Sequence, residues 1–144
     1  MNILLLTDGS PHSVEAARWL AGHAREYRDA PDIHLLHVHP PLPYPRAAEV
    51  VGRGAVEAYQ REVSEEALAP AARVLEEAGI AFRKSWTIGD IVPAVDEYAR
   101  VGGFRLVVMG THGHGAALNL AMGSVVTKCI ATLRVPVVVV PKGP

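Results

Sequence analysis

Short apolar runs alternate with amphipathic segments along the whole chain, and this alternation limits the possible folds more than any other feature. The candidate strands span residues 2–7, 33–39, 80–87, 106–109 and 135–140. Between them, apolar residues recur every three or four positions, as in helices that bury one face. Such alternation is typical of a parallel sheet covered by helices on both faces. We therefore expect an α/β, single-domain, three-layer sandwich of the Rossmann-like or flavodoxin-like kind over residues 1–144.

The helices expected between the strands cover residues 11–27, 49–78, 90–102 and 123–133. Ser10 and Pro11 are typical of an N-cap and a first helical turn. In the second helix, Pro70 should cause a break or kink near residues 66–70, because proline lacks a backbone N–H. The stretch Pro40–Arg46 contains four prolines and is expected to be a surface loop.

Size and charge exclude several classes of partner. The chain has 144 residues, 49% of them apolar, which suits one core and one domain. Its 14 basic and 15 acidic residues give a net charge of −1, which does not favour nucleic acid or an anionic membrane. No apolar run approaches the roughly 20 residues needed to cross a bilayer. The first strand follows Met1 without a basic leader, and the lone Cys129 permits no intrachain disulfide, so we expect a cytoplasmic protein.

Glycines recur at a defined spacing around the fourth predicted strand. This strand ends in Gly110-Thr-His-Gly113, and nine residues later the chain reads Gly123-Ser124. Glycines allow close approach to the backbone and leave its N–H groups open to an anion. The Ser124 hydroxyl is expected to cap the next helix, whose positive end would face the same anion. The spacing predicts a phosphate-binding loop.

This spacing, placed before a C-terminal strand of valines, resembles the nucleotide-binding motif of the universal stress protein family. The segment Ile3–Ser10 is similar to the family's first strand and turn, and Leu36–Val38 to the end of its second strand. The resemblance covers essentially the whole chain. It implies the strand order 3-2-1-4-5, with a topological switch point between strands 1 and 4 where such sheets bind ligands.

The resemblance also implies a ligand, its contacts and a partner. The ligand is ATP or another adenine nucleotide, with magnesium or manganese as a candidate accompanying metal. The residues that match the family's nucleotide contacts are Thr7, Asp8, Val38, Met109, Gly110, Gly113, Gly123, Ser124 and Val125. Dimers common in the family imply a homodimer through the edge strand Val137–Val140. The flanking residues Pro136 and Pro141 could instead blunt that edge.

Some of these residues also fit purely structural roles. Asp8 could accept hydrogen bonds from a ribose or an adenine amino group, or it could cap the helix that follows. The glycines could simply permit a loop and a helix start. Five histidines lie near the predicted strand ends: His12, His37, His39, His112 and His114. They could form a zinc or nickel cluster, or they could be solvated or hydrogen-bonded imidazoles.

Motifs of common phosphate-transferring and hydrolytic enzymes do not occur in the sequence. There is no Gly-x-x-x-x-Gly-Lys-Ser/Thr loop and no Gly-x-Ser-x-Gly elbow, and Asp8 lacks the acidic neighbours of a receiver domain. No catalytic residue is assigned. We therefore predict a universal stress protein that binds ATP and acts as a dimeric, nucleotide-responsive stress-response module. The alternatives are a family member that acts only through protein interactions without ATP, and a slow ATPase or nucleotide hydrolase.

Overall fold

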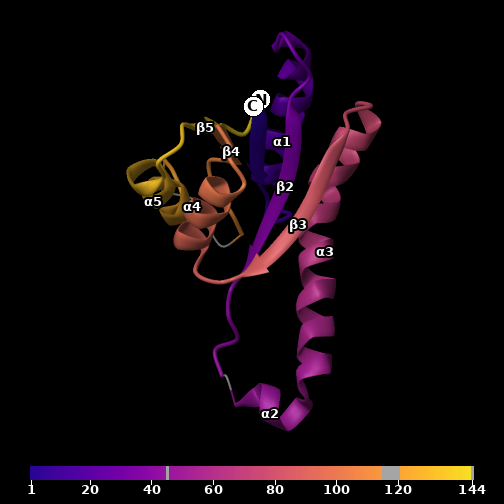
Figure 1. Ribbon diagram of the computed structural model, residues 1–144, viewed down its shortest axis with the longest axis vertical. Coiled ribbons are helices and arrows are strands. Elements are labelled where there is room, and N and C mark those ends of the chain that lie inside the picture. The colour runs from indigo at the N-terminus through magenta and orange to yellow at the C-terminus, as the bar shows by residue number, and fades with distance from the viewer. Residues whose placement is uncertain (45, 115–120, 144) are drawn as a thin grey trace.

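All five strands form one parallel sheet in the order β3-β2-β1-β4-β5 (Figure 1). The computed structural model describes residues 1–44, 46–114 and 121–143. Its strands are β1 (Asn2–Leu6), β2 (Asp32–His39), β3 (Phe82–Ile88), β4 (Leu106–Gly110) and β5 (Val137–Val140). The expected α/β class and strand order are confirmed.

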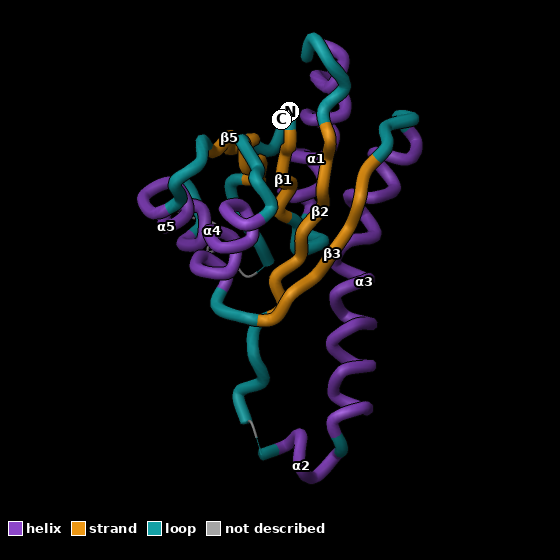
Figure 2. The backbone as a smooth tube through the Cα atoms, viewed as in Figure 1, coloured by secondary structure: helices purple, strands orange, loops and turns teal. Residues whose placement is uncertain are grey.

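Helices cover both faces of the sheet. The helical segments are α1 (Pro11–His23), the 3-10 turn η1 (Ala24–Glu26), α2 (Ala47–Val51), α3 (Arg53–Glu77), α4 (Ile91–Val101) and α5 (Ser124–Thr132). Helices α1 and α3 pack on one face, and α4 and α5 lie on the other, which gives the expected three layers (Figure 2). Within the described ranges, no helix is both long and apolar enough to cross a membrane.

Alternate residues of the central strands supply the cores on the two faces. In β1, Ile3 and Leu5 pack with residues of α1 and α3, whereas Leu4 packs with residues of α4. All three side chains are fully buried. A parallel strand covered on both faces needs apolar residues at every position, which explains why this run of the sequence is continuous rather than alternating.

The start of α1 follows its sequence signals. The backbone N–H of Ser13 donates to Ser10 Oγ at 3.3 Å, so Ser10 is the N-cap, and Pro11 is the first helical residue. Helix α1 ends at His23, and the 3-10 turn η1 extends the helical path to Glu26, next to the predicted end.

Of the break or kink predicted near Pro70, the break is wrong. Helix α3 continues without interruption from Arg53 to Glu77 with Pro70 in its interior. The proline removes the hydrogen bond to the Glu66 carbonyl, a change that costs about 3 kcal/mol in a helix interior. The buried residues around it are Leu68, Ala71, Ala72 and Leu75. They pack against the sheet and hold the helix together across the proline.

The helical region is divided at Gly52 instead. Gly52 separates α2 from α3 and has a φ of +94°, a conformation that favours glycine. Helix α2 has no buried residue, and α2 and the first half of α3 project beyond the end of the sheet (Figure 1). The interruption therefore falls where tertiary packing does not support a helix.

The lone cysteine has a structural position. Cys129 is fully buried on α5, in a cluster with Met109 and Val126. Burial raises the pKa of its thiol to about 11, so the thiol is protonated at neutral pH. The environment is that of a small apolar side chain and not of an activated nucleophile.

Candidate functional site

A cavity of about 210 Å³ lies at the carboxyl ends of β1, β2 and β4. From β1 the chain passes to β2 on one side, and from β4 it passes to β5 on the other side. This is the topological switch point, where open parallel sheets bind ligands. All nine residues that match the nucleotide-binding motif line this cavity. Their contact with a nucleotide stays a prediction.

Polar atoms of Thr7 tie the end of β1 to its neighbours. The Thr7 hydroxyl donates to Ser13 Oγ at 3.1 Å, and Ser13 Oγ in turn donates to Ser10 O at 2.9 Å. The Thr7 carbonyl accepts a hydrogen bond from Nδ1 of His37 at 2.9 Å. The hydroxyl is therefore engaged within the protein, and it organises the floor of the cavity.

The Asp8 carboxylate joins the turn after β1 to the glycine loop after β4. Its Oδ1 accepts from the Ser10 N–H at 2.9 Å, and its Oδ2 accepts from the His114 N–H at 3.0 Å. Burial alone would raise the pKa of Asp8, but the hydrogen bonds from Ser10 and His114 outweigh burial and lower it. Asp8 is thus ionised at neutral pH. The alternative expected for Asp8, a cap on the following helix, is wrong, because Ser10 is the N-cap of α1. Asp8 instead closes the turn before that helix and adds a link across the cavity that sequence alone does not predict.

The three motif glycines lie in different surroundings. A Cβ added to Gly110 would lie 2.4 Å from the backbone oxygen of His12, so β4 and α1 approach too closely for any side chain. At Gly113 a Cβ would lie 2.5 Å from Oδ2 of Asp8. At Gly123 it would meet only ordinary contacts from 3.4 Å outward. Two glycines therefore permit close packing, whereas a side chain at Gly123 would fit with ordinary contacts to Thr111 and His112.

Ser124 does not cap α5, which corrects the sequence-based expectation. The N-cap is Gly123, Ser124 is the first helical residue, and no side chain caps this helix end. The Gly123 N–H donates to Thr111 O at 2.8 Å, which places the helix start against the glycine loop. The Ser124 hydroxyl and the first N–H groups of α5 are consequently available at the cavity, at the positive end of a helix.

The histidines separate into two groups. His37 and His39 lie on β2 with ring centroids 6.3 Å apart. His12 and His112 lie on the β4 side with ring centroids 5.0 Å apart, and both contact the Thr111 hydroxyl. In the part of the chain that the structure describes, no three His, Cys, Asp or Glu residues are placed to hold a metal ion. The imidazoles of these four histidines take part in hydrogen bonds within the protein.

A second, more open cavity of about 610 Å³ adjoins the first. The residues shared by the two cavities are Asp8, His37, Val38, Ile91 and His114. Helix α3 adds Val63, Glu66 and Ala67 to the second cavity. Sequence reasoning missed these three residues and Ile91. For Ile91, its position at the start of the helix predicted after the third strand was an available signal, whereas the residues of α3 follow the ordinary pattern of a surface helix.

The sheet order defines a parallel α/β protein with a cavity at its switch point, the place where such sheets bind ligands. The model of the universal stress protein family matches residues 1–141. The chain therefore belongs to the universal stress protein family. One relative, universal stress protein MJ0531 of Methanocaldococcus jannaschii, is 29% identical over 140 residues, which cover 97% of this chain and 81% of the relative.

Solved structures show the same fold at low sequence identity. UspA from Lactobacillus plantarum superposes with a TM-score of 0.78 at 18% identity, over 97% of each chain. A family protein from Arabidopsis thaliana with bound AMP gives a TM-score of 0.70 at 14% identity, over 99% of this chain and 92% of that one. A universal stress protein in complex with cAMP gives a TM-score of 0.68 at 20% identity. The universal stress protein of Archaeoglobus fulgidus in complex with dAMP gives a TM-score of 0.67 at 16% identity.

Proposed function

We propose that this protein binds an adenine nucleotide, with ATP as its ligand, at the cavity between β1 and β4, and acts as a nucleotide-responsive module in a cytoplasmic stress response. The observation that carries the proposal is the convergence of Asp8 and the glycine loop on one cavity, with Asp8 Oδ2 and the His114 N–H 3.0 Å apart. Adenine nucleotides bound to structural relatives agree with it.

The two ends of the cavity suit different parts of a nucleotide. The phosphates would lie at the start of α5, where backbone N–H groups and the Ser124 hydroxyl donate hydrogen bonds. The nucleoside would lie toward Val38 and Met109. Asp8 is the one carboxylate lining this cavity among the described residues. A magnesium or manganese ion would therefore depend mainly on phosphate oxygens for its ligands.

The proposal is for binding rather than hydrolysis. A general base works best with a pKa near the working pH, whereas the pKa of Asp8 is lowered and both of its oxygens accept hydrogen bonds. A bound nucleotide would stabilise the glycine loop after β4 and the start of α5 around it, and this stabilisation would be the response to the nucleotide.

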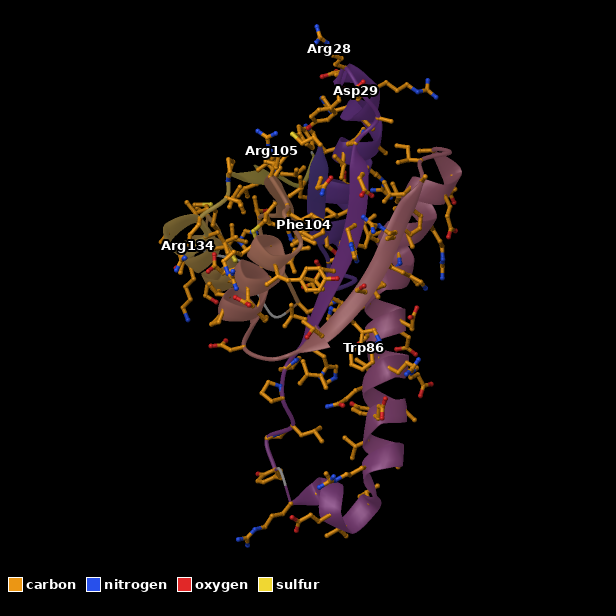
Figure 3. The ribbon with its side chains drawn as sticks, in the orientation of Figure 1. Arg28, Asp29, Trp86, Phe104, Arg105 and Arg134 are labelled. Carbon is orange, nitrogen blue, oxygen red and sulfur yellow. The ribbon has the colours of Figure 1, made fainter. Side chains whose placement is uncertain are left out.

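Calorimetric titration with ATP tests the binding proposal. We expect saturable binding at sub-millimolar ATP and displacement by AMP. Asp8→Ala should weaken binding about tenfold or more, because two hydrogen bonds that shape the cavity are lost. Asp29→Ala is the matched control, since Asp29 lies at the opposite end of the molecule (Figure 3). An absence of heat with ATP, AMP and ADP at millimolar concentration would contradict the proposal.

We also propose a homodimer through the open edge of β5. The strand consists of four valines at one edge of the sheet. The other edge, β3, carries exposed Arg83 and Lys84, charged residues of the kind that discourage pairing at strand edges. A two-fold pairing of identical β5 edges would satisfy the outward backbone groups of both copies.

A proline at one position of β5 can test this dimer. Val107 is paired with Val137, and its N–H donates to Pro136 O. In a parallel ladder, the polar groups of residues 136, 138 and 140 therefore face β4, while those of residues 137 and 139 face outward. Val139→Pro should remove an outward N–H, keep the ladder to β4 and convert the dimer to a monomer in analytical ultracentrifugation. Val139→Thr keeps the N–H and should stay dimeric. A Val139→Pro variant that is dimeric as well would contradict the proposal.

A further inference from the structure

The arm formed by α2 and the first half of α3 ends in an exposed tip, residues 46–53 (Figure 1). Val50 and Val51 of this tip are 87% and 64% exposed, and α2 has no buried residue. Short helices are stable in water only when tertiary packing covers an apolar face. The tip thus presents two adjacent apolar side chains that contacts within its own chain leave largely uncovered.

Positive charge flanks these two valines. The charged residues of the tip are Arg46, Glu49 and Arg53, two basic residues and one acidic residue, so the tip has a net charge of +1. All three residues are exposed. A surface that covers the tip should therefore combine apolar side chains with negative charge.

The second cavity has this character. Its described lining includes the carboxylates of Asp8 and Glu66 and no lysine or arginine. The other titratable groups of this lining are His37, His39 and His114. Its apolar side chains are those of Val38, Pro40, Val63, Ala67 and Ile91. Because the cavity offers about 610 Å³ of space, apolar side chains of another surface can enter it.

The tip cannot reach the cavity of its own chain. Arg53 begins α3 and Val63 lies three turns further along it, which separates them by about 15 Å in a straight helix. A bend at Gly52 moves Val50 by only two residues of chain, about 7 Å when fully extended. While α3 stays helical, a tip that fills the cavity must therefore come from another molecule.

An apolar stripe on α3 connects the tip with the cavity. Val56, Tyr59 and Val63 recur at spacings of three and four, so they lie on one face of the helix, and Tyr59 is 55% exposed. Tyr59 is also midway in sequence between Val51 and Ala67. Two α3 helices packed antiparallel about a two-fold axis near Tyr59 would therefore bring each tip to the cavity of the other copy. Such a contact is closed, because each copy gives one tip and receives one.

We propose that the tip docks into the second cavity of a second copy of this chain, whose own tip docks in return. Val50 and Val51 would contact the apolar wall that α3 supplies, and the arginines of the tip would face Asp8 and Glu66. Strand β5 lies at the opposite edge of the sheet from β3, so this contact leaves the proposed pairing of β5 open. The contact is independent of nucleotide binding. Since only short segments take part, association should appear only above about 100 µM.

Sedimentation equilibrium over a range of protein concentrations tests the contact. The average mass of the wild type should be about twice as large at about 500 µM as at about 5 µM, whether the species at low concentration is a monomer or the β5 dimer. Val50→Asp should lose this increase, because it would bring a carboxylate into an acidic cavity. Val101→Asp is the matched control: Val101 is 69% exposed on α4 and lines neither cavity, so its change should keep the increase.

Charge reversal tests whether the tip and the cavity are the surfaces that pair. One variant, Arg46→Glu/Arg53→Glu, has an acidic tip, and the other, Glu66→Arg, has a cavity without net negative charge from its carboxylate pair. Each variant alone should lose most of the increase in mass. An equimolar mixture should regain it, because the basic tip of one variant meets the acidic cavity of the other, and the acidic tip meets the introduced arginine.

Several results would overturn the proposal. A wild-type mass that stays constant up to about 500 µM would do so, and so would an increase that persists in Val50→Asp or in both charge variants alone. Loss of the increase in Val101→Asp as well would show an unspecific effect of added charge. A mixture that associates no better than its components would exclude the pairing of tip and cavity. A constant mass with a more compact shape in sedimentation velocity would show that the arm folds back on its own chain. Titration with ATP is unaffected by these outcomes and tests the proposed function separately.

Discussion

Gly110→Ala should lower the free energy of unfolding by about 1 to 3 kcal/mol, the usual effect of overpacking a closely packed contact. The added Cβ would lie 2.4 Å from the backbone oxygen of His12, and backbone cannot move aside as cheaply as a flexible side chain. The end of β4 and the start of α1 would have to separate. Urea unfolding followed by circular dichroism measures the change.

Gly123→Ala is the matched control for this effect. Gly123 has an extended backbone, with φ −67° and ψ 157°, and its added Cβ would make only ordinary contacts. Its free energy of unfolding should stay within about 0.5 kcal/mol of the wild type. Equal losses in the two variants would show that the close contact between Gly110 and His12 is not what makes alanine costly.

Gly113→Val should abolish the stabilisation of the protein by ATP. In the wild type, ATP at a hundred times its Kd should add about 2.7 kcal/mol to the free energy of unfolding. The Cβ at Gly113 would lie 2.5 Å from Asp8 Oδ2, so the carboxylate must leave its position beside the His114 N–H. The new side chain would thus act by displacing Asp8, and it need not occupy the phosphate position itself.

Thermal unfolding with and without ATP measures this loss. The variant without ATP should unfold cooperatively near the wild-type temperature, because the Asp8 side chain can move and no backbone is displaced. Gly22→Val serves as the matched control, because a Cβ added at Gly22 meets no atom within 4 Å and Gly22 lines neither cavity. A Gly113→Val protein that keeps the full ATP-dependent rise in melting temperature would refute the assignment of the glycine loop.

The elements most accurately predicted from sequence are those whose signals are local. Residues 2–7 were expected to form a strand, and β1 covers Asn2–Leu6, because a strand buried on both faces needs a continuous apolar run. Ser10 and Pro11 likewise begin α1 as expected, since an N-cap depends on its own residue and on the N–H groups one turn ahead.

Tertiary contacts overruled the local signals at Pro70 and Ser124. Pro70 lies in the part of α3 that packs on the sheet, where buried neighbours offset a lost hydrogen bond. At Ser124, the bond from the Gly123 N–H to Thr111 O brings the chain into α5 one residue earlier than a serine cap requires. Neither contact can be predicted from the residues next to it in sequence.

Sequence identified the residues of the first cavity better than those of the second. The glycine motif and the strand ends are compact patterns, and the fold brings them to one place. By contrast, Val63 and Glu66 reach the second cavity from the middle of a long helix, where one apolar and one acidic residue have no distinctive spacing. Only the packing of α3 beside the end of β2 shows that they face the same space as His39.

The hydrogen bond between Asp8 and His114 determines at which stage of synthesis the proposed nucleotide site can form. Its partners are 106 positions apart, one after the first strand and the other after the fourth. A chain emerging from the ribosome would expose Asp8 early, yet this carboxylate would lack its second partner until His114 had been made. Nascent chains arrested after β3 should therefore fail to retain nucleotide, and capture of ATP would mark synthesis beyond the glycine loop.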